Sequence, residues 1–236
     1  MIISFIKNVI KKTAPVSVLK AMQTRLLNKQ RDKFRQGNLI LLYHVDDILT
    51  KAGIPYWLNY GTLLGAYRDN DFIPHDYDLD IGLMMQYHQH VKSLLLSNGF
   101  IQVFEAHMGC SWDNPEIVEY RFKYSDVCID FNFYIKQDNK VTTYDFVPIK
   151  DINYTPNPNK RLPILVEGVT SPLMGLTTIS FKDRLFSVPA NTEEYIVANY
   201  GPSWRTPVKD WDYHDYAENI KVYKPGEVYG EIIIFS

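Results

Sequence analysis

The sequence predicts an α+β domain, and three observations carry this prediction. The chain has 236 residues, 46% of them hydrophobic and 22% charged, which is an ordinary globular composition and excludes a disordered or fibrous chain. Segments with helical periodicity are mixed with short segments of strand composition. These segments do not alternate regularly as strand and helix, which argues against a doubly wound parallel sheet.

The first 36 residues are predicted to form a basic amphipathic helical arm, and residues 37–236 one domain. Residues 1–36 carry nine basic residues and one acid, a charge of +8, whereas the remainder carries −10. Apolar residues recur at helical spacing between Ile2 and Ile10, Pro15 interrupts the pattern, and a second basic stretch follows. Such a segment is typical of helices that lie on an anionic membrane. The apolar stripe could equally pack on the domain, and the sequence leaves both interpretations open.

Periodicity and turn residues place the elements of the first half of the domain. Apolar residues between Leu39 and Leu49 predict a helix that ends near Gly53, with Pro55 beyond it. Strands are then predicted at residues 56–58 and 79–83, helices at residues 61–67 and 86–98, and a loop at residues 70–74.

The second half is predicted to be richer in strands. Strand composition marks residues 100–104, 119–124, 127–134 and 141–146, with a tight hairpin turn between the middle pair. Residues 148–172 contain five prolines and are predicted to be loop. Asn191 is predicted to cap a last helix, which ends at Tyr200 and Gly201.

Three carboxylates at alternate positions form the most informative pattern. Asp76, Asp78 and Asp80 alternate with Tyr77 and Leu79, so a strand would place all three on one face. Like charges on one face repel each other, and a bound divalent cation is the usual means of stabilising such a set. An Asp-x-Asp pattern by itself is also frequent in solvated surface loops. The metal site is therefore predicted from this pattern together with features on either side of it.

A phosphate-binding turn is predicted upstream of the carboxylates. Gly61 and Thr62 open a helix after a strand, which makes backbone amides and a hydroxyl available to a phosphate. Arg68, two turns along, offers a guanidinium fork for a second phosphoryl oxygen. The Gly-Thr pair could also be a simple helix cap.

Asp130 is a further candidate because it lies within an apolar strand. A carboxylate in such a strand needs a partner. A metal ion or an acceptor hydroxyl could supply one, and so could Arg121 or Lys123 on the adjoining strand.

At these residues the chain resembles the LicD/fukutin family, a branch of the nucleotidyltransferase superfamily related to DNA polymerase β. The family carries Gly-Thr-Leu-Leu-Gly-x-x-Arg, then Ile-Pro, then an Asp-x-Asp strand, which here occupy residues 61–68, 73–74 and 78–80. A Tyr-Gly-x-x-Trp-x-x-Pro segment of the family matches residues 200–207. Bacterial LicD proteins usually read Trp-Asp-Asp-Asp-Ile-Asp where this chain has His75 and Tyr77 in place of the Trp and one acid, so this strand is closer to fukutin-like sequences.

The resemblance implies a polymerase-β-like nucleotidyltransferase fold, with a mixed β-sheet flanked by helices. It also implies transfer of phosphocholine, or of an alditol phosphate such as ribitol phosphate, from a CDP-activated donor to a hydroxyl of a cell-surface glycan, with release of CMP. Mg²⁺ or Mn²⁺ is the expected cofactor. The expected catalytic and metal-binding residues are Asp78, Asp80 and Asp130, with Asp130 either a metal ligand or the acceptor of the proton. The expected substrate-binding residues are Gly61, Thr62, Arg68 and Asp76.

Two other function classes stay open, namely a nucleotidyltransferase that releases pyrophosphate and a non-catalytic glycan-binding scaffold. The expected partners are a CDP-linked donor and an acceptor such as lipopolysaccharide, capsule or a teichoic-type polymer. The net charge of −2 argues against nucleic acid. The longest apolar run is too short to span a bilayer and no convincing signal peptide is found, so a cytoplasmic location is expected, peripheral at the inner face of the membrane if the arm binds there.

Overall fold

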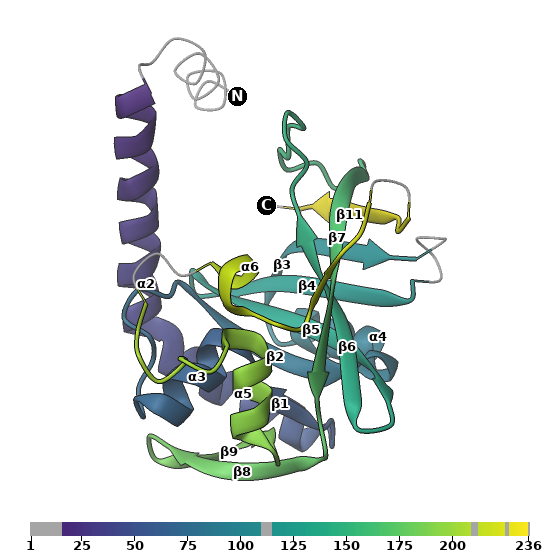
Figure 1. The fold of residues 1–236 in the computed structure, drawn as a ribbon. Coiled ribbons are helices and arrows are strands. Elements are labelled where there is room, and N and C mark those ends of the chain that lie inside the picture. The colour runs from purple at the N-terminus through teal and green to yellow at the C-terminus, as the bar shows by residue number, and fades with distance from the viewer. Residues whose placement is uncertain (1–15, 110–114, 209–211, 225–226, 236) are drawn as a thin grey trace.

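The computed structural model describes residues 16–109, 115–208, 212–224 and 227–235, and Figure 1 shows its elements. The helical segments are α2 (Val16–Lys51), α3 (Tyr60–Arg68), η1 (Met85–Tyr87, a 3-10 turn), α4 (His88–Ser97), α5 (Thr192–Tyr200) and α6 (Tyr213–Tyr216). The strands are β1 (Tyr56–Leu58), β2 (Asp78–Met84), β3 (Ile101–Met108), β4 (Ile117–Tyr124), β5 (Val127–Gln137), β6 (Lys140–Val147), β7 (Leu162–Pro172), β8 (Leu176–Phe181), β9 (Arg184–Pro189), β10 (Ile220–Val222) and β11 (Gly230–Ile234).

Among the described residues, nine strands form one mixed sheet, and β8 and β9 pair separately. Pairings run from β5 through β4, β3, β11, β7 and β6 back to β5, so this part of the sheet closes into a ring. The long strand β5 reaches both neighbours because residues 127–132 pair with β4 and residues 135–137 with β6. β2 runs parallel to β5, whereas β1 runs antiparallel to β2. The expected mixed sheet flanked by helices is confirmed.

Apolar and polar side chains alternate along the central strands β2, β4 and β5, so the sheet has one apolar face and one polar face. The positions on the apolar face are fully buried: Leu79, Ile81 and Leu83 on β2, Val118, Tyr120 and Phe122 on β4, and Ile129, Phe131 and Phe133 on β5. The apolar sides of α2 and α4 pack in the same core cluster. The intervening positions carry the charged and amide side chains, which therefore point to the opposite face of the sheet.

Helix α2 continues through the boundary expected between residues 36 and 37. Its described side chains at residues 24–26 and 28–30 are exposed, and the ribbon projects away from the body there (Figure 1). Residues 1–15, which hold the first apolar stripe of the expected arm, lie outside the described residues. Within the part of the chain that the structure describes, no helix is both long and apolar enough to cross a membrane.

The last turns of the expected arm belong structurally to the domain. Phe34 is only 2% exposed, within the main hydrophobic core. The Arg31 Nε donates to the carbonyl of His75 at 2.8 Å, and the Arg35 Nη2 donates to the carbonyl of Pro74 at 2.9 Å. The apolar side of α2 from Phe34 onward thus packs on the domain, so the division expected at residue 36 falls inside a packed helix.

The prediction that residues 148–172 form a loop is wrong for the last part of this segment. β7 is an eleven-residue strand that pairs with β6, β10 and β11. Its prolines lie near its ends: Pro163 precedes the residues that pair with β6, and Pro172 is the last residue. A strand tolerates proline at such positions because few ladder hydrogen bonds are lost there. The proline content of residues 148–172 therefore does not exclude a strand in this segment.

Candidate active site

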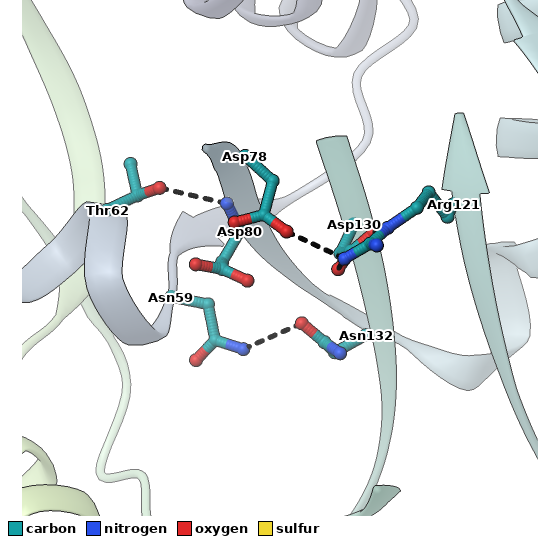
Figure 2. A network of polar contacts seen from close by, with 7 residues as sticks. All are labelled: Asn59, Thr62, Asp78, Asp80, Arg121, Asp130 and Asn132. Atoms are coloured by element: carbon teal, nitrogen blue, oxygen red, sulfur yellow. Dashed lines mark hydrogen bonds and ion pairs between the residues drawn. The ribbon is translucent and has the colours of Figure 1, made fainter. Parts of the chain in front are cut away.

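Asp78, Asp80 and Asp130 meet on the polar face of the sheet. β2 and β5 run parallel, with Asp80 opposite Asp130 and Asp78 opposite Cys128. The period of two places Asp78 and Asp80 on the same face of β2, and Figure 2 shows both carboxylates near that of Asp130. Asp76 precedes β2, which begins at Asp78, so the expectation that one strand carries all three acids of this segment is wrong.

Arg121 on β4 is the cation that faces these carboxylates (Figure 2). β4 and β5 pair antiparallel, which brings Arg121 opposite Asp130. Its Nη2 donates to Oδ2 of Asp78 at 2.6 Å, its Nε donates to Oδ1 of Asp130 at 2.5 Å, and Nη2 also pairs with Oδ2 of Asp130. Of the two basic partners considered for Asp130, the structure selects Arg121. Across the described residues, no ion pair reaches the Asp80 carboxylate.

Burial and mutual repulsion disfavour the charged form of these carboxyl groups. Burial, followed by the charge of Asp130, raises the pKa of Asp78 to about 8 despite the opposing effect of Arg121. Burial and the charges of Asp78 and Asp130 raise the pKa of Asp80 well above its usual value. Burial and the same charge of Asp130 also raise the pKa of Glu119 on β4. The site thus concentrates more negative charge than one guanidinium neutralises, which is the environment that a hard divalent cation stabilises.

The same geometry shows which carboxylates fit a metal ion. In the described ranges, no three His, Cys, Asp or Glu side chains converge in an arrangement that could hold a metal. Both oxygens of Asp130 pair with Arg121, so this carboxylate can reach a metal ion only if the guanidinium leaves it. Asp78 and Asp80 supply the oxygen ligands that Mg²⁺ prefers, and two carboxylates suffice for an ion that takes further ligands from water and a substrate's phosphates.

The turn at Gly61 and Thr62 begins α3 and borders the carboxylates. A Cβ on Gly61 would stand 2.7 Å from Oδ2 of Asp76, which would have to move, and at an ordinary contact distance of 3.5 Å from Oδ2 of Asp80. Thr62 is buried, and its Oγ1 accepts the backbone N–H of Asp80 at 2.9 Å (Figure 2). Thr62 therefore positions β2, and the expected contact of its hydroxyl with substrate stays a prediction.

Asn59 anchors this turn, and sequence reasoning missed it. Its side chain is fully buried, and its Nδ2 donates to Oδ1 of Asn132 at 3.1 Å and to the hydroxyl of Tyr134 at 2.9 Å. Its Oδ1 accepts from the hydroxyl of Tyr195 at 2.8 Å, and its backbone N–H donates to the carbonyl of Asp80 at 3.0 Å. No pattern in the sequence distinguishes this amide from an ordinary surface asparagine.

Two cavities meet at Asp78 and Asp80. The first has a volume of about 210 Å³, and its other lining residues include Gly61, Arg68, His75, Asp76, Tyr200 and Trp204. The second has a volume of about 530 Å³, and its other lining residues include Tyr60, Glu119, Arg121, Asp130, Asn132 and Asp145. A group held at the two aspartates is therefore accessible from two sides.

Arg68 and Asp76 both line the first cavity, and their contact with substrate stays a prediction. The Arg68 guanidinium makes a two-point pair with Asp69, with Nε 3.0 Å from Oδ1 and Nη2 2.7 Å from Oδ2, and its Nη1 donates to the carbonyl of Trp204 at 3.2 Å. These contacts fix the guanidinium at the cavity wall. Burial raises the pKa of Asp76 to about 6, against the opposing charges of Arg31 and Arg68.

A family model matches the part of the chain that contains most of this site. Residues 53–191 match the family model described as LicD/FKTN/FKRP, nucleotidyltransferase domain, which is more than half of the chain. The chain belongs to the LicD/FKTN/FKRP family. The resemblance expected from the Gly-Thr turn and the Asp-x-Asp strand is thus confirmed, and both motifs lie inside the matched range.

The chain is also similar to two curated human proteins. The chain is 28% identical over 193 residues to human "Ribitol-5-phosphate transferase FKTN", a match that covers 80% of this chain and 37% of the relative. It is 49% identical over 43 residues to human "Ribitol 5-phosphate transferase FKRP", covering 18% of this chain and 9% of the relative. This family member therefore spans little more than a third of the length of its fukutin relatives.

Two solved structures align with this chain at low similarity. The lincomycin-bound lincosamide antibiotic adenylyltransferase LnuA aligns with a TM-score of 0.39 at 15% identity, over 65% of this chain and 80% of that chain. ANT(2")-Ia in complex with adenylyl-2"-tobramycin aligns with a TM-score of 0.43 at 12% identity, over 75% of this chain and 83% of that chain. Both scores are low, so the family assignment rests on the sequence match.

Proposed function

We propose that this LicD/FKTN/FKRP-family chain is a metal-dependent phosphotransferase. It moves phosphocholine or an alditol phosphate such as ribitol phosphate from a CDP-activated donor to a hydroxyl of a cell-surface glycan and releases CMP. The observation that carries the proposal is the position of Asp78 and Asp80 at the junction of two cavities of different character. The names of the human relatives support transfer of a phosphate-linked group.

The donor is assigned to the first cavity on electrostatic grounds. This cavity contains the beginning of α3 at Gly61 and the guanidinium of Arg68. A helix N-terminus and a guanidinium fork both favour phosphoryl oxygens. Gly61 brings the backbone close to Asp76 and Asp80, so a diphosphate in this cavity would lie beside both the turn and the carboxylates.

The metal is assigned to Asp78 and Asp80, with Asp130 as the third carboxylate of the site. Mg²⁺ or Mn²⁺ bound there would neutralise charge on the phosphoryl oxygens. The backbone of Asp80 is held from two sides, by Thr62 and by the N–H of Asn59, so its carboxylate is placed in advance. Such positioning is the main contribution of a protein to phosphoryl transfer.

The acceptor is assigned to the second cavity. Glu119 and Asp145 line it, and burial raises the pKa of both carboxyl groups, so this cavity disfavours further negative charge such as that of the donor diphosphate. Carboxylate and amide groups instead accept hydrogen bonds from sugar hydroxyls. The acceptor oxygen would form a bond to phosphorus while the bond from phosphorus to the CMP oxygen breaks, and the hydroxyl proton would pass to a carboxylate of the site, for which Asp130 is the candidate. If Asp130 is instead a metal ligand, Asp130→Asn will weaken Mn²⁺ binding as well as turnover.

A CMP-release assay tests the proposed reaction. Purified protein is incubated with Mg²⁺, a short glycan acceptor and a panel of CDP-linked choline, ethanolamine, ribitol and glycerol. Asp78→Asn and Asp80→Asn should each lower the rate by at least about 10²-fold, because they remove a charge that holds the metal at the reacting group. Asp183→Asn, an exposed aspartate outside the site, is the matched control and should not change the rate.

Other outcomes would replace this proposal. CMP release that survives in both site variants removes the metal assignment. Release of pyrophosphate from CTP instead of CMP from a CDP compound would favour a nucleotidyltransferase, the activity for which the family domain is named. Glycan binding without turnover of any donor would favour the scaffold function.

The turns of α2 around Arg25 and Lys29 are proposed to bind an anionic membrane surface. Arg25 and Lys29 lie there on exposed positions, and the packed part of the helix begins only at Phe34. Sedimentation with anionic and neutral vesicles tests this, using full-length protein and the double variant Arg25→Glu/Lys29→Glu. The matched control reverses two exposed lysines elsewhere, Lys136 and Lys140. Equal sedimentation of all three proteins would exclude the helix as the binding surface.

A further inference from the structure

Arg121 contacts two of the three carboxylates of the site from a fixed backbone position. Arg121 lies opposite Asp130 in the antiparallel pair of β4 and β5, and Asp130 lies opposite Asp80 in the parallel pair of β2 and β5. One row across three strands therefore carries Arg121, Asp130 and Asp80. The guanidinium reaches both oxygens of Asp130 and one oxygen of Asp78 (Figure 2).

These are the oxygens that a divalent cation at the site would use. Mg²⁺ binds carboxylate oxygens directly, at about 2.0–2.1 Å and in near-octahedral geometry. The N–H groups of Arg121 approach the same oxygens to 2.5 Å at Asp130 and 2.6 Å at Asp78, so they occupy directions from which a metal would bind. Two cations at this separation also repel each other. Arg121 and a divalent ion therefore compete for Asp78 and Asp130.

The second cavity gives the guanidinium room to change partners. Arg121 lines this cavity, its side chain is 26% exposed, and its guanidinium carbon lies 5.4 Å from the centre of the Phe104 ring. The cavity meets the first one at Asp78 and Asp80, where the phosphoryl group of a donor would lie. A guanidinium fork matches the spacing of phosphoryl oxygens and stabilises charge that develops on them.

We propose that Arg121 is a catalytic residue that exchanges partners during the reaction. It pairs with Asp78 and Asp130 until a divalent cation binds, and it then donates its N–H groups to a non-bridging oxygen of the transferred phosphoryl group. The second half of this inference rests on the proposed function, whereas the competition with the metal does not. Arginine keeps its charge at every working pH, so Arg121 itself is not switched by protonation.

The first experiment measures metal binding without turnover. Full-length protein is treated with EDTA, and Mn²⁺ binding is followed from the electron paramagnetic resonance signal of free Mn²⁺. Arg121→Met should bind Mn²⁺ about tenfold more tightly than the wild type, because the competing cation is gone. Arg184→Met is the matched control, since Arg184 also pairs with two aspartates, Asp46 and Asp47, outside the site, and it should bind Mn²⁺ as the wild type does. Equal or weaker binding in Arg121→Met overturns the competition.

Thermal unfolding adds a second readout and covers a variant that folds poorly. Arg121→Met should have a lower midpoint than the wild type in EDTA, and Mn²⁺ should raise its midpoint by more than it raises that of the wild type. Arg121→Lys keeps the charge but not the fork, and its Mn²⁺ affinity should lie between those of the other two proteins. An Mn²⁺-induced rise that is the same in all three proteins counts against the competition.

Turnover tests the catalytic half separately. At saturating Mn²⁺, kcat for CMP release should fall about 10²-fold or more in Arg121→Met, with a smaller change in the donor KM. An unchanged kcat overturns the contact with the phosphoryl group even if Mn²⁺ binds more tightly. Wild-type protein that releases no CMP from any donor overturns the proposed function, and the Mn²⁺ measurements still decide the competition.

Discussion

Replacing Asn59 tests whether the buried amide holds the site together. Asn59→Ala removes two hydrogen bonds donated by Nδ2, at 3.1 and 2.9 Å, and one accepted by Oδ1, at 2.8 Å. The Tyr195 hydroxyl still reaches the Tyr134 hydroxyl at 3.2 Å, so the Asn132 oxygen is the partner left without its donor. A buried polar atom without a partner costs about 1–3 kcal/mol, and the cavity adds to this, so we expect a total loss of about 3–4 kcal/mol.

Urea unfolding followed by tryptophan fluorescence measures this loss. With a slope of about 3 kcal/mol per molar for a chain of this size, the midpoint should fall by about 1 M. Asn98→Ala is the matched control, because Asn98 is exposed at the end of α4 and its side-chain Nδ2 donates to the Leu94 carbonyl at 2.8 Å. A loss below about 1 kcal/mol in Asn59→Ala, no larger than in the control, would refute the anchoring role.

Three further predictions concern acid stability, the Gly-Thr turn and the arm. Burial tends to raise the pKa of Glu105, but His107 and Lys92 outweigh it and lower this pKa from 4.5 to about 2. The stabilisation is therefore complete above about pH 4.5 and lost as the pH falls toward 2. Urea unfolding across this pH range should show that the free energy of unfolding of the wild type falls by an amount on the order of 3 kcal/mol. The fall should be much smaller in Glu105→Gln. Gly61→Ala should lower the rate of CMP release about 10²-fold, because the new Cβ would stand 2.7 Å from Oδ2 of Asp76, while the urea midpoint changes little; an unchanged rate would show that Asp76 moves aside freely. Phe34→Ala should destabilise the protein by about 3–4 kcal/mol in urea unfolding, whereas Leu26→Ala, at a position 59% exposed on the same helix, should have almost no effect; similar losses in both would contradict the boundary between packed and exposed helix.

The sequence predicts those features of the site that depend only on residues close together in the chain. The period of two placed Asp78 and Asp80 together on a strand, and the Gly-Thr turn was expected at the start of a helix, as the structure has them. Asp130 was identified because a carboxylate in an apolar strand needs a partner. Each of these inferences needs only a few neighbouring residues.

What local pattern could not predict depends on pairing between distant segments. The match of Asp130 with Asp80 is set by the parallel register of β2 and β5, which no single segment encodes, whereas its match with Arg121 follows from the tight hairpin between β4 and β5. Asn59 acquires its role only when Tyr195, 136 residues away, packs against it. β7 escapes local prediction for a similar reason, because only its pairing with β6, β10 and β11 shows that a strand continues between Pro163 and Pro172 near its two ends.

The continuity of α2 has a mechanical consequence. A helix rises about 1.5 Å per residue, so its 36 residues form a rod of about 54 Å, of which the C-terminal part is fixed in the core. Any surface that binds the exposed turns is thereby held at a set distance and orientation from the carboxylates. Adding one residue to those turns would lengthen the rod slightly but rotate the bound surface by about 100° around it. The rotation of the exposed turns about the helix axis, more than the length of the helix, would then decide which direction the two cavities face relative to the bound surface.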